Sequence, residues 1–178
     1  KGNVFIVGVI GNLRTVKDPL STVETFVRLN SLSRIPAILA VFGEDRENYG
    51  PMMMEIAERA GLGNKFLLMG FRRPIEAWVM ACDLILATSR EDGFGRSIIE
   101  AMSAGVPVVA TKAGGHSEII DHKVNGILVK PGDVDQMAQA AFSVLTSPAL
   151  QKNLIENARV KVVSNYSSNS HAKEITCL

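Results

Sequence analysis

Two acidic residues beside a glycine turn are the residues of this sequence best suited to binding a ligand. Asp92 and Glu100 stand eight positions apart, and the turn Gly93-Phe94-Gly95 directly follows Asp92. Carboxylates accept paired hydrogen bonds from vicinal hydroxyls, which sugars and riboses present. Free N–H groups at a helix start bind anions, and glycines let a ligand approach the backbone. These residues predict a phosphate or sugar-diphosphate site; the alternative is a plain turn with Asp92 as a cap and Glu100 as a surface acid.

The residues around this turn follow a strand–turn–helix–strand pattern. An apolar run at 83–88 precedes the turn, and another run covers 106–110. Between them, Ile98, Ile99 and Met102 share one face of a predicted helix. Such units build parallel sheets and place ligands at the carboxyl ends of the strands.

Six short apolar runs alternate with helical patterns along the chain. The expected strands cover residues 4–10, 37–42, 66–69, 83–88, 106–110 and 127–129. This alternation predicts an α/β fold, a doubly wound Rossmann-like parallel sheet of about six strands with right-handed crossovers. We expect residues 1–178 to form a single domain, with residues 165–178 as a frayed or truncated tail.

The composition excludes several classes of protein. Hydrophobic residues make up 47% of the chain and the net charge is +1, so no general attraction to nucleic acid or to an anionic membrane is expected. No apolar run approaches the roughly 18 residues of a transmembrane helix. Cys82 and Cys177 lack metal or redox spacing, which indicates one buried thiol and one tail thiol in a reducing compartment. The sequence begins directly on a strand, so we expect it to be cut from a longer protein.

The segment 89–111, SREDGFGRSIIEAMSAGVPVVAT, resembles the signature of a known enzyme group. The group comprises retaining glycosyltransferases with the two-domain GT-B fold, called family 4 or group 1. In these enzymes an acid, seven residues and a glutamate flank a Gly-Phe-Gly turn, followed by Glu-Ala-Met and Gly-x-Pro-Val-Val. The resemblance continues over nearly the whole chain, through Lys17, Gly43, Met69-Gly70-Phe71, Gly114-Gly115 with Glu118, and Pro131-Gly132-Asp133.

This resemblance implies that the chain is the C-terminal, nucleotide-sugar-binding half of such an enzyme. Glu100 would bind the donor ribose, and Asp92 would contact the transferred sugar. Lys17 would neutralise the diphosphate and help it to leave. The region around the nucleotide base and the backbone around the diphosphate would include Phe71, Arg72, Gly93, Phe94, Gly95 and Arg96.

Two positions depart from the family pattern. The family usually has glutamate as its first acid, whereas this chain has Asp92 preceded by Glu91, which leaves the sugar contact open. The family also usually has an arginine five residues before the lysine, and here that residue is Asn12. Arg14 is a candidate for the missing cation, with a solvated loop charge as the alternative.

Other motifs receive structural interpretations. Asp133-Val134-Asp135 has the Asp-x-Asp pattern of some metal sites, but it opens a predicted helix and is expected to cap it. His116, His122 and His171 have no metal-ligand spacing, and His116 is interpreted as a loop histidine rather than a ligand contact. Trp78 is expected to pack in the core.

By resemblance, we expect a hexosyltransferase that uses a nucleotide-diphosphate sugar without a metal or other cofactor. The acceptor would bind to an N-terminal domain, and this part alone would transfer little. The resemblance favours cell-envelope or polysaccharide biosynthesis in the cytoplasm, possible peripheral membrane association at the inner face, and no nucleic-acid partner. The alternatives are a catalytically inactive nucleotide-binding or regulatory module, and a nucleotide-sugar 2-epimerase-like enzyme.

Overall fold

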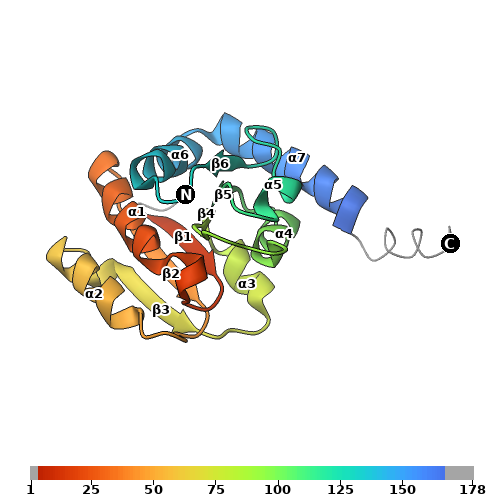
Figure 1. Cartoon of the computed structure of the whole chain (residues 1–178). Coiled ribbons are helices and arrows are strands. Elements are labelled where there is room, and N and C mark those ends of the chain that lie inside the picture. Colours follow the sequence, from red (N-terminus) through yellow and green to blue (C-terminus); the bar gives the residue numbers. More distant parts are fainter. Residues whose placement is uncertain (1–3, 167–178) are drawn as a thin grey trace.

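A computed structural model describes residues 4–166, and these residues contain one six-stranded parallel sheet (Figure 1). The strands are β1 (Phe5–Ile10), β2 (Ala37–Phe42), β3 (Phe66–Gly70), β4 (Leu84–Ala87), β5 (Val108–Thr111) and β6 (Ile127–Val129). Their order is β3-β2-β1-β4-β5-β6, and every neighbouring pair is parallel. The predicted doubly wound, Rossmann-like sheet is therefore confirmed.

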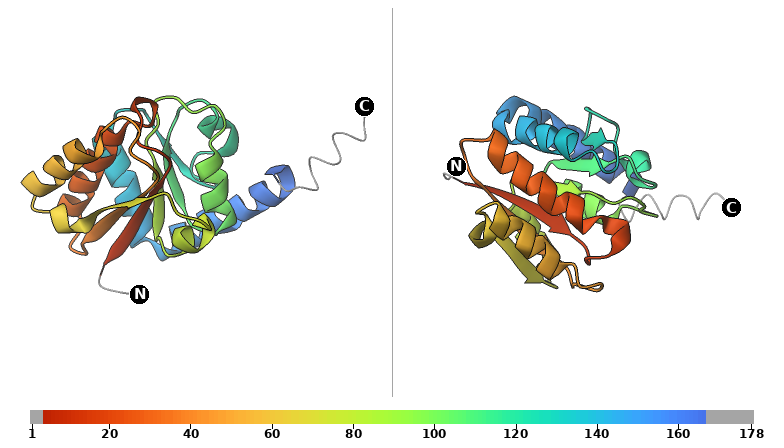
Figure 2. Two further views of the ribbon diagram at one scale, coloured as in Figure 1. Left: turned by 90° about the horizontal axis from the view of Figure 1, so that it is seen from below. Right: turned by 60° about the vertical axis from the view of Figure 1, so that its left-hand side comes forward.

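Helices cover both faces of this sheet (Figure 2). They are α1 (Pro19–Leu32), α2 (Gly50–Arg59), α3 (Ile75–Met80), α4 (Arg96–Ser103), α5 (His116–Ile119), α6 (Val134–Thr146) and α7 (Pro148–Tyr166), with short 3-10 turns η1 (Thr15–Lys17) and η2 (Gly63–Lys65). Residues 165 and 166, which the sequence pattern assigns to the tail, belong to α7. The rest of that tail, with Cys177 and His171, lies outside the described residues.

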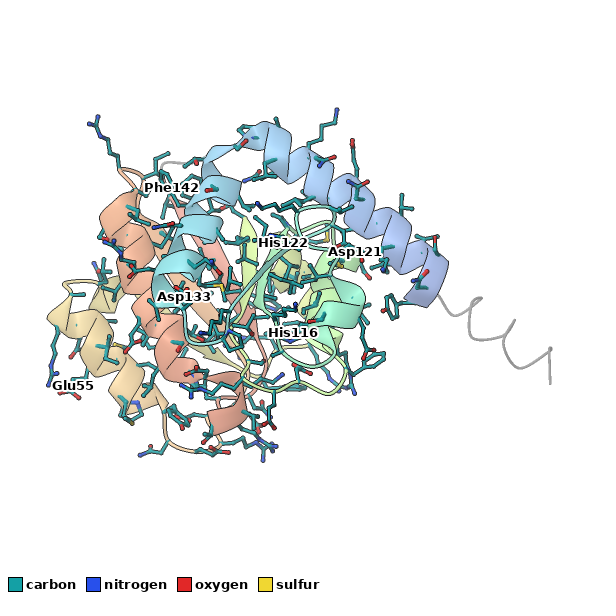
Figure 3. The ribbon with its side chains drawn as sticks, turned by 45° about the horizontal axis from the view of Figure 1, so that its top comes forward. Glu55, His116, Asp121, His122, Asp133 and Phe142 are labelled. Atoms are coloured by element: carbon teal, nitrogen blue, oxygen red, sulfur yellow. The ribbon has the colours of Figure 1, made fainter. Side chains whose placement is uncertain are left out.

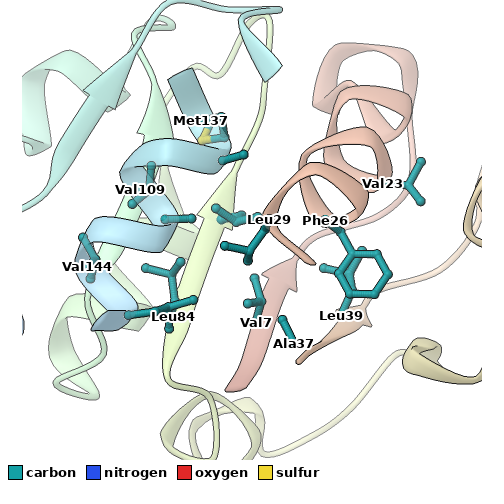
Figure 4. Close-up of a cluster of buried hydrophobic side chains, with 14 of the residues drawn as sticks. Val7, Val23, Phe26, Leu29, Ala37, Leu39, Leu84, Val109, Met137 and Val144 are labelled. Carbon is teal, nitrogen blue, oxygen red and sulfur yellow. The ribbon is translucent and has the colours of Figure 1, made fainter. Parts of the chain in front are cut away.

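Alternate residues of each central strand face two separate hydrophobic cores. In β4, Leu84 and Leu86 pack with α1, α2 and α6, while Ile85 and Ala87 pack with α3, α4 and α5. Figure 4 shows the first core, where the fully buried ring of Phe26 on α1 lies over the sheet. Burial on both faces explains why the strands are continuously apolar in sequence.

Side-chain caps fix the starts of two helices, as the sequence predicts. An Asp18 carboxylate oxygen accepts a hydrogen bond from the Ser21 backbone N–H at 3.4 Å, with Pro19 as the first residue of α1. An Asp133 carboxylate oxygen accepts one from the Gln136 N–H at 2.9 Å. Asp133 is thus engaged as the cap of α6, as expected for this Asp-x-Asp sequence.

The strand order of the sheet reverses at β1, and this reversal marks a possible ligand-binding position. The chain leaves β1 toward β2 on one side, and it returns to β4 on the other side of β1. The connections that follow β1 and β4 therefore diverge and leave a crevice at the carboxyl ends of these strands. In open α/β sheets, ligands bind in this crevice.

Candidate functional site

Hydrogen bonds and an ion pair join the loops that follow β1 and β4 across the crevice. The Thr88 hydroxyl donates a hydrogen bond to the Lys17 carbonyl oxygen at 2.9 Å, and the Arg90 backbone N–H donates to the Val16 carbonyl oxygen at the same distance. The Arg90 guanidinium also pairs with the buried Asp18 carboxylate at 2.8 Å. These contacts hold the Lys17 loop in a fixed position beside the glycine turn.

Asp92 lies at the centre of this arrangement. Its Oδ1 accepts hydrogen bonds from the backbone N–H groups of Gly95 at 2.9 Å and Phe94 at 3.3 Å. Its Oδ2 forms an ion pair with the Lys17 ammonium and lies 3.2 Å from Nε2 of His116. Asp92 thus closes its own turn and contacts two basic side chains, but it is not the cap of α4, whose N-cap is Gly95.

The environment of Asp92 stabilises its ionised form. Burial opposes ionisation, but the hydrogen bonds from Lys17 and the Gly95 N–H and the charge of Lys17 outweigh it. A further hydrogen bond from His116 acts in the same direction. The pKa of Asp92 is therefore held well below its ordinary value, and the carboxylate is charged at neutral pH.

His116 is a site residue that the sequence interpretation missed. It opens α5 and its side chain is fully buried, rather than lying in an open loop (Figure 3). Its Nδ1 lies 2.9 Å from the Thr111 carbonyl oxygen, and its Nε2 faces Asp92. In the sequence, the double glycine before His116 is the feature that could have indicated this close packing. A Cβ on Gly114 would overlap the Asp92 carbonyl oxygen, so only glycine fits there.

The start of α4 provides backbone donors beside these charges. Gly95 precedes the helix with φ of 67°, a left-handed conformation that favours glycine, and no side chain caps the helix. A Cβ on Gly95 would also lie 2.7 Å from the Ile119 side chain. The sequence thus places the positive end of a helix dipole at the crevice, as predicted from the glycine turn.

Four of the predicted binding residues line one pocket of about 310 Å³. The pocket lies between the loops that follow β1, β2 and β3 and the first turns of α4. Phe71 and Arg72 come from the loop after β3, and Arg96 and Glu100 come from α4. A larger apolar pocket of about 480 Å³ between α3, α4 and the end of α7 shares Arg96 and Glu100 with it.

Glu100 is the half-buried acid of this pocket. Burial raises its pKa above the ordinary value, the charge of Arg96 one turn earlier opposes this effect, and the charge of Glu76 adds to it. Glu100 is therefore partly buried rather than freely exposed, and the alternative interpretation as a surface acid stays open. A carboxylate that is partly desolvated gains more from a hydrogen-bond donor than an exposed one does.

Aromatic side chains form one wall of the same region. The Arg72 guanidinium lies 5.7 Å from the centre of the Trp78 ring, which in turn lies 6.0 Å from the Phe42 ring. Trp78 is 38% exposed, so the expectation that it packs in the core is only partly met. Arg73 lies 5.2 Å from the exposed ring of Phe71. These rings provide flat surfaces beside the pocket.

Asn12, which departs from the family pattern, and Arg14, the candidate for the missing cation, have different roles. The Asn12 side-chain oxygen accepts a hydrogen bond from the Glu44 backbone N–H at 2.9 Å, which joins the loops after β1 and β2. Arg14 is exposed, and its charge reaches Glu47, whose pKa is lowered mainly by hydrogen bonds from Thr15. The structure does not bring Arg14 into the contacts around Asp92.

Within residues 4–166 there is neither a metal-binding cluster nor a membrane-spanning helix. Residues 4–166 contain no cluster of three or more histidine, cysteine, aspartate or glutamate side chains that could hold a metal ion. His122 accepts a hydrogen bond at Nδ1 from the Leu128 backbone N–H. Within the same range, no helix has the length and apolar character needed to cross a membrane.

The fold and the candidate site define a doubly wound α/β domain whose cluster of charged side chains lies at the reversal of its strand order. A family model described as glycosyl transferases group 1 matches residues 1–161. The chain therefore belongs to the group 1 glycosyl transferases.

Curated relatives and solved structures agree with this assignment. N-acetyl-alpha-D-glucosaminyl L-malate synthase of Bacillus anthracis is 28% identical over 89% of this chain, and 2-deoxystreptamine N-acetyl-D-glucosaminyltransferase of Niallia circulans is 35% identical over 64% of it. The chain spans only 41% and 30% of these relatives. The C-terminal domain of a group 1 protein from Francisella tularensis superposes with a TM-score of 0.83 at 26% identity, over 92% of this chain and 87% of that one.

Another solved structure contains ligands. Anabaena Alr3699/HepE in complex with UDP and glucose superposes with a TM-score of 0.88 at 28% identity, over 99% of this chain and 49% of that chain. The expected fold, that of a GT-B C-terminal domain, is thereby confirmed.

Proposed function

We propose that this chain is the C-terminal, donor-binding domain of a retaining family 4 glycosyltransferase, which transfers a hexose from a nucleotide-diphosphate sugar. One observation carries the proposal. Glu100, Arg96 and Arg72 line a single pocket at the carboxyl ends of the strands, next to the loop that holds Lys17. A carboxylate for hydroxyls and several donors for a diphosphate therefore lie where this fold binds ligands.

Each side chain has a separate role in the proposed site. Glu100 accepts hydrogen bonds from the ribose hydroxyls, as carboxylates do in related α/β folds. Arg96, Lys17 and the N-terminus of α4 surround the diphosphate and stabilise the charge that grows on it as the sugar leaves. The ring of Phe71 and the guanidinium of Arg72 flank the base. No metal is needed in this proposal, because the protein itself supplies the positive charge.

Similar proteins support the choice of ligand. Anabaena Alr3699/HepE, at 28% identity, has been solved with UDP-glucose as well as with UDP and glucose. Relatives at 28% and 35% identity are named for the transfer or attachment of N-acetylglucosaminyl groups. We therefore propose UDP-sugars as the first donors to test, with GDP- and ADP-sugars beside them.

The proposed acceptor site lies in an N-terminal domain, as the partial coverage of the relatives suggests. We expect the 178-residue chain to bind a nucleotide and to transfer little sugar without that domain. We propose that the whole enzyme acts in the cytoplasm on a cell-envelope or polysaccharide acceptor. It would contact the inner face of the membrane peripherally.

One observation favours a second candidate function. Asp92 is occupied by two backbone N–H groups and two basic side chains, so its contact with a sugar is less direct than the family pattern implies. A domain that binds nucleotide without transfer would fit this arrangement. A 2-epimerase-like activity is the third candidate.

An assay of the protein that contains this chain with its N-terminal half separates these candidates. Incubation with a panel of nucleotide sugars and a hydroxyl-bearing acceptor should release a nucleoside diphosphate and join the sugar to the acceptor oxygen with the anomeric configuration of the donor, as seen by NMR. Tight nucleotide binding without release would identify the inactive module. Conversion of the donor into an isomer without loss of the nucleotide would identify the epimerase, and inversion of configuration would contradict the retaining assignment.

A further inference from the structure

The contacts of His116 indicate where its protons lie. Its Nδ1 lies 2.9 Å from the Thr111 carbonyl oxygen, which can only accept a hydrogen bond. Its Nε2 lies 3.2 Å from Oδ2 of Asp92, and this carboxylate is ionised. Because both nitrogens face acceptors, a ring with an N–H at each of them satisfies both contacts, and that ring carries a positive charge.

The surroundings of the ring restrict its movement. The His116 side chain has no exposed surface. The loop that precedes it is docked on Asp92, since the Gly115 backbone N–H donates a hydrogen bond to the Asp92 carbonyl oxygen at 2.8 Å. Gly114 packs against the same carbonyl, where no larger residue fits. The ring and the carboxylate are therefore held together by two adjacent loops.

We propose that His116 is a positioning residue, a buried imidazolium that holds the Asp92 carboxylate and so leaves the Lys17 ammonium available to a diphosphate. The inference rests on the proposed donor-binding function. Asp92 carries one negative charge and faces two cations, Lys17 and His116. The cluster therefore has a net positive charge beside the start of α4, which attracts an anion. Without His116, Asp92 would neutralise Lys17 alone.

This role accounts for Asp92, the aspartate that stands where the family usually has glutamate as its first acid. Asp92 reaches Lys17, His116 and its own turn with a side chain one methylene shorter than glutamate. His116 contacts Oδ2 of the carboxylate, whereas the N–H groups of the turn contact Oδ1. In this chain the first acid serves mainly to organise the cations.

The protonation of His116 can be measured on the protein without a ligand. Long-range ¹H–¹⁵N NMR spectra of the histidine rings at neutral pH should show both His116 nitrogens protonated. His122 provides an internal contrast, since its Nδ1 accepts a hydrogen bond and must lack a proton. In Asp92→Asn, the Nε2 proton of His116 should be lost. An unprotonated Nε2 in the unaltered protein would overturn the proposal.

Two substitutions separate a positioning role from a merely structural one. Glutamine places an amide nitrogen near the position of Nε2. Asparagine places one near Nδ1 instead, so Asp92 loses the hydrogen bond that Nε2 donates. His116→Asn should weaken UDP binding by about tenfold, since a charge-assisted hydrogen bond is lost, and should change UMP binding less. His116→Gln keeps a hydrogen-bond donor for Asp92 but lacks the positive charge of the imidazolium, so it should weaken UDP binding less than His116→Asn does.

The outcomes of this experiment are distinct. Equal losses of UDP and UMP binding in both variants would show a structural role only, and unchanged UDP binding in His116→Asn would overturn the positioning role. If the unaltered chain bound no nucleotide, the proposed function would fail, while the NMR measurement would still decide the charge of His116. Thermal unfolding of each variant establishes that the compared proteins are folded.

Discussion

The Lys17 ammonium and the Asp92 carboxylate form an ion pair that joins the loop after β1 to the loop after β4. These residues lie 75 positions apart in the sequence, and they meet because parallel strands end at the same edge of the sheet. The pair lies where the strand order reverses, beside the proposed diphosphate site. The same contact therefore stabilises the packing of two loops and orients the Lys17 ammonium toward the proposed site.

This pair predicts a pH-dependent contribution to stability. Asp92 has a pKa below its ordinary value of 3.8 in the folded protein, so its stabilising effect is present above that value and is lost as the pH falls through the folded pKa. Asp92→Asn should lower the free energy of unfolding by about 1–2 kcal/mol at neutral pH, and by less below about pH 3. Urea denaturation at both pH values measures the difference. Asp135→Asn, at an exposed pair with Arg28, is the control and should cost less. An equal loss from Asp92→Asn at both pH values would contradict this prediction.

Glu100 should reduce stability in the absence of ligand. Because burial raises its pKa, the folded state disfavours the charged form, and ionised Glu100 costs stability at neutral pH. Glu100→Gln should therefore leave the free energy of unfolding unchanged or raise it by up to about 1 kcal/mol. The matched control is Glu24→Gln on the exposed face of α1, which should have no effect. A clear destabilisation by Glu100→Gln would show that Glu100 has a structural role instead.

Gly114 should tolerate no side chain. Its φ is 44°, and a Cβ would overlap the Asp92 carbonyl oxygen, so Gly114→Ala combines backbone strain with a clash against another backbone segment. We expect a loss of about 2–4 kcal/mol in the free energy of unfolding. Gly132 also has a positive φ, of 78°, but a Cβ there would have no neighbour within 4 Å. Gly132→Ala should thus cost only about 1–2 kcal/mol, and equal losses from the two variants would rule out the clash.

Trp78 should report on the binding pocket through its fluorescence. It is the single tryptophan of the chain and lies under the Arg72 guanidinium, which lines the pocket. A nucleotide that engages Arg72 should change the emission of Trp78, and Arg72→Ala should change the emission without ligand and weaken the response. Arg59→Ala is the control, since Arg59 lies on α2 in an exposed pair with Glu55 and does not line the pocket. An identical nucleotide response in Arg72→Ala would remove Arg72 from the binding site.

Much of the fold could be predicted because the sequence pattern is simple. Strands buried on both faces must be continuously apolar, and glycine or proline marks the ends of several elements. Lys17 and Asp92 lie in loops that follow strands ending at one edge of the sheet, but the family resemblance, and not the spacing, singled out Lys17. The end of α7 was less predictable, because Val160 and Val163 in its last turns are exposed while Val162 is buried, so the apolar residues there do not all lie on one face.

The contacts of individual side chains were harder to predict. His116 follows a double glycine, but its burial depends on how closely the loop after β5 packs on the glycine turn, a distance that no local pattern encodes. Trp78 has helical spacing typical of a core residue, yet its ring lies at the border of the pocket under Arg72. Such contacts depend on tertiary packing between elements that are far apart in the sequence.

The most direct test of the account is calorimetric titration of the 178-residue chain with UDP, GDP and ADP. We predict that one of these nucleotides binds with one-to-one stoichiometry. We also predict that Glu100→Gln weakens this binding by about tenfold because the ribose hydroxyls lose a charged acceptor, while Glu24→Gln does not. Absence of binding to the folded chain for all three, when a longer protein containing it binds one, would contradict the donor-binding assignment. Unaltered affinity in Glu100→Gln would contradict the role of Glu100.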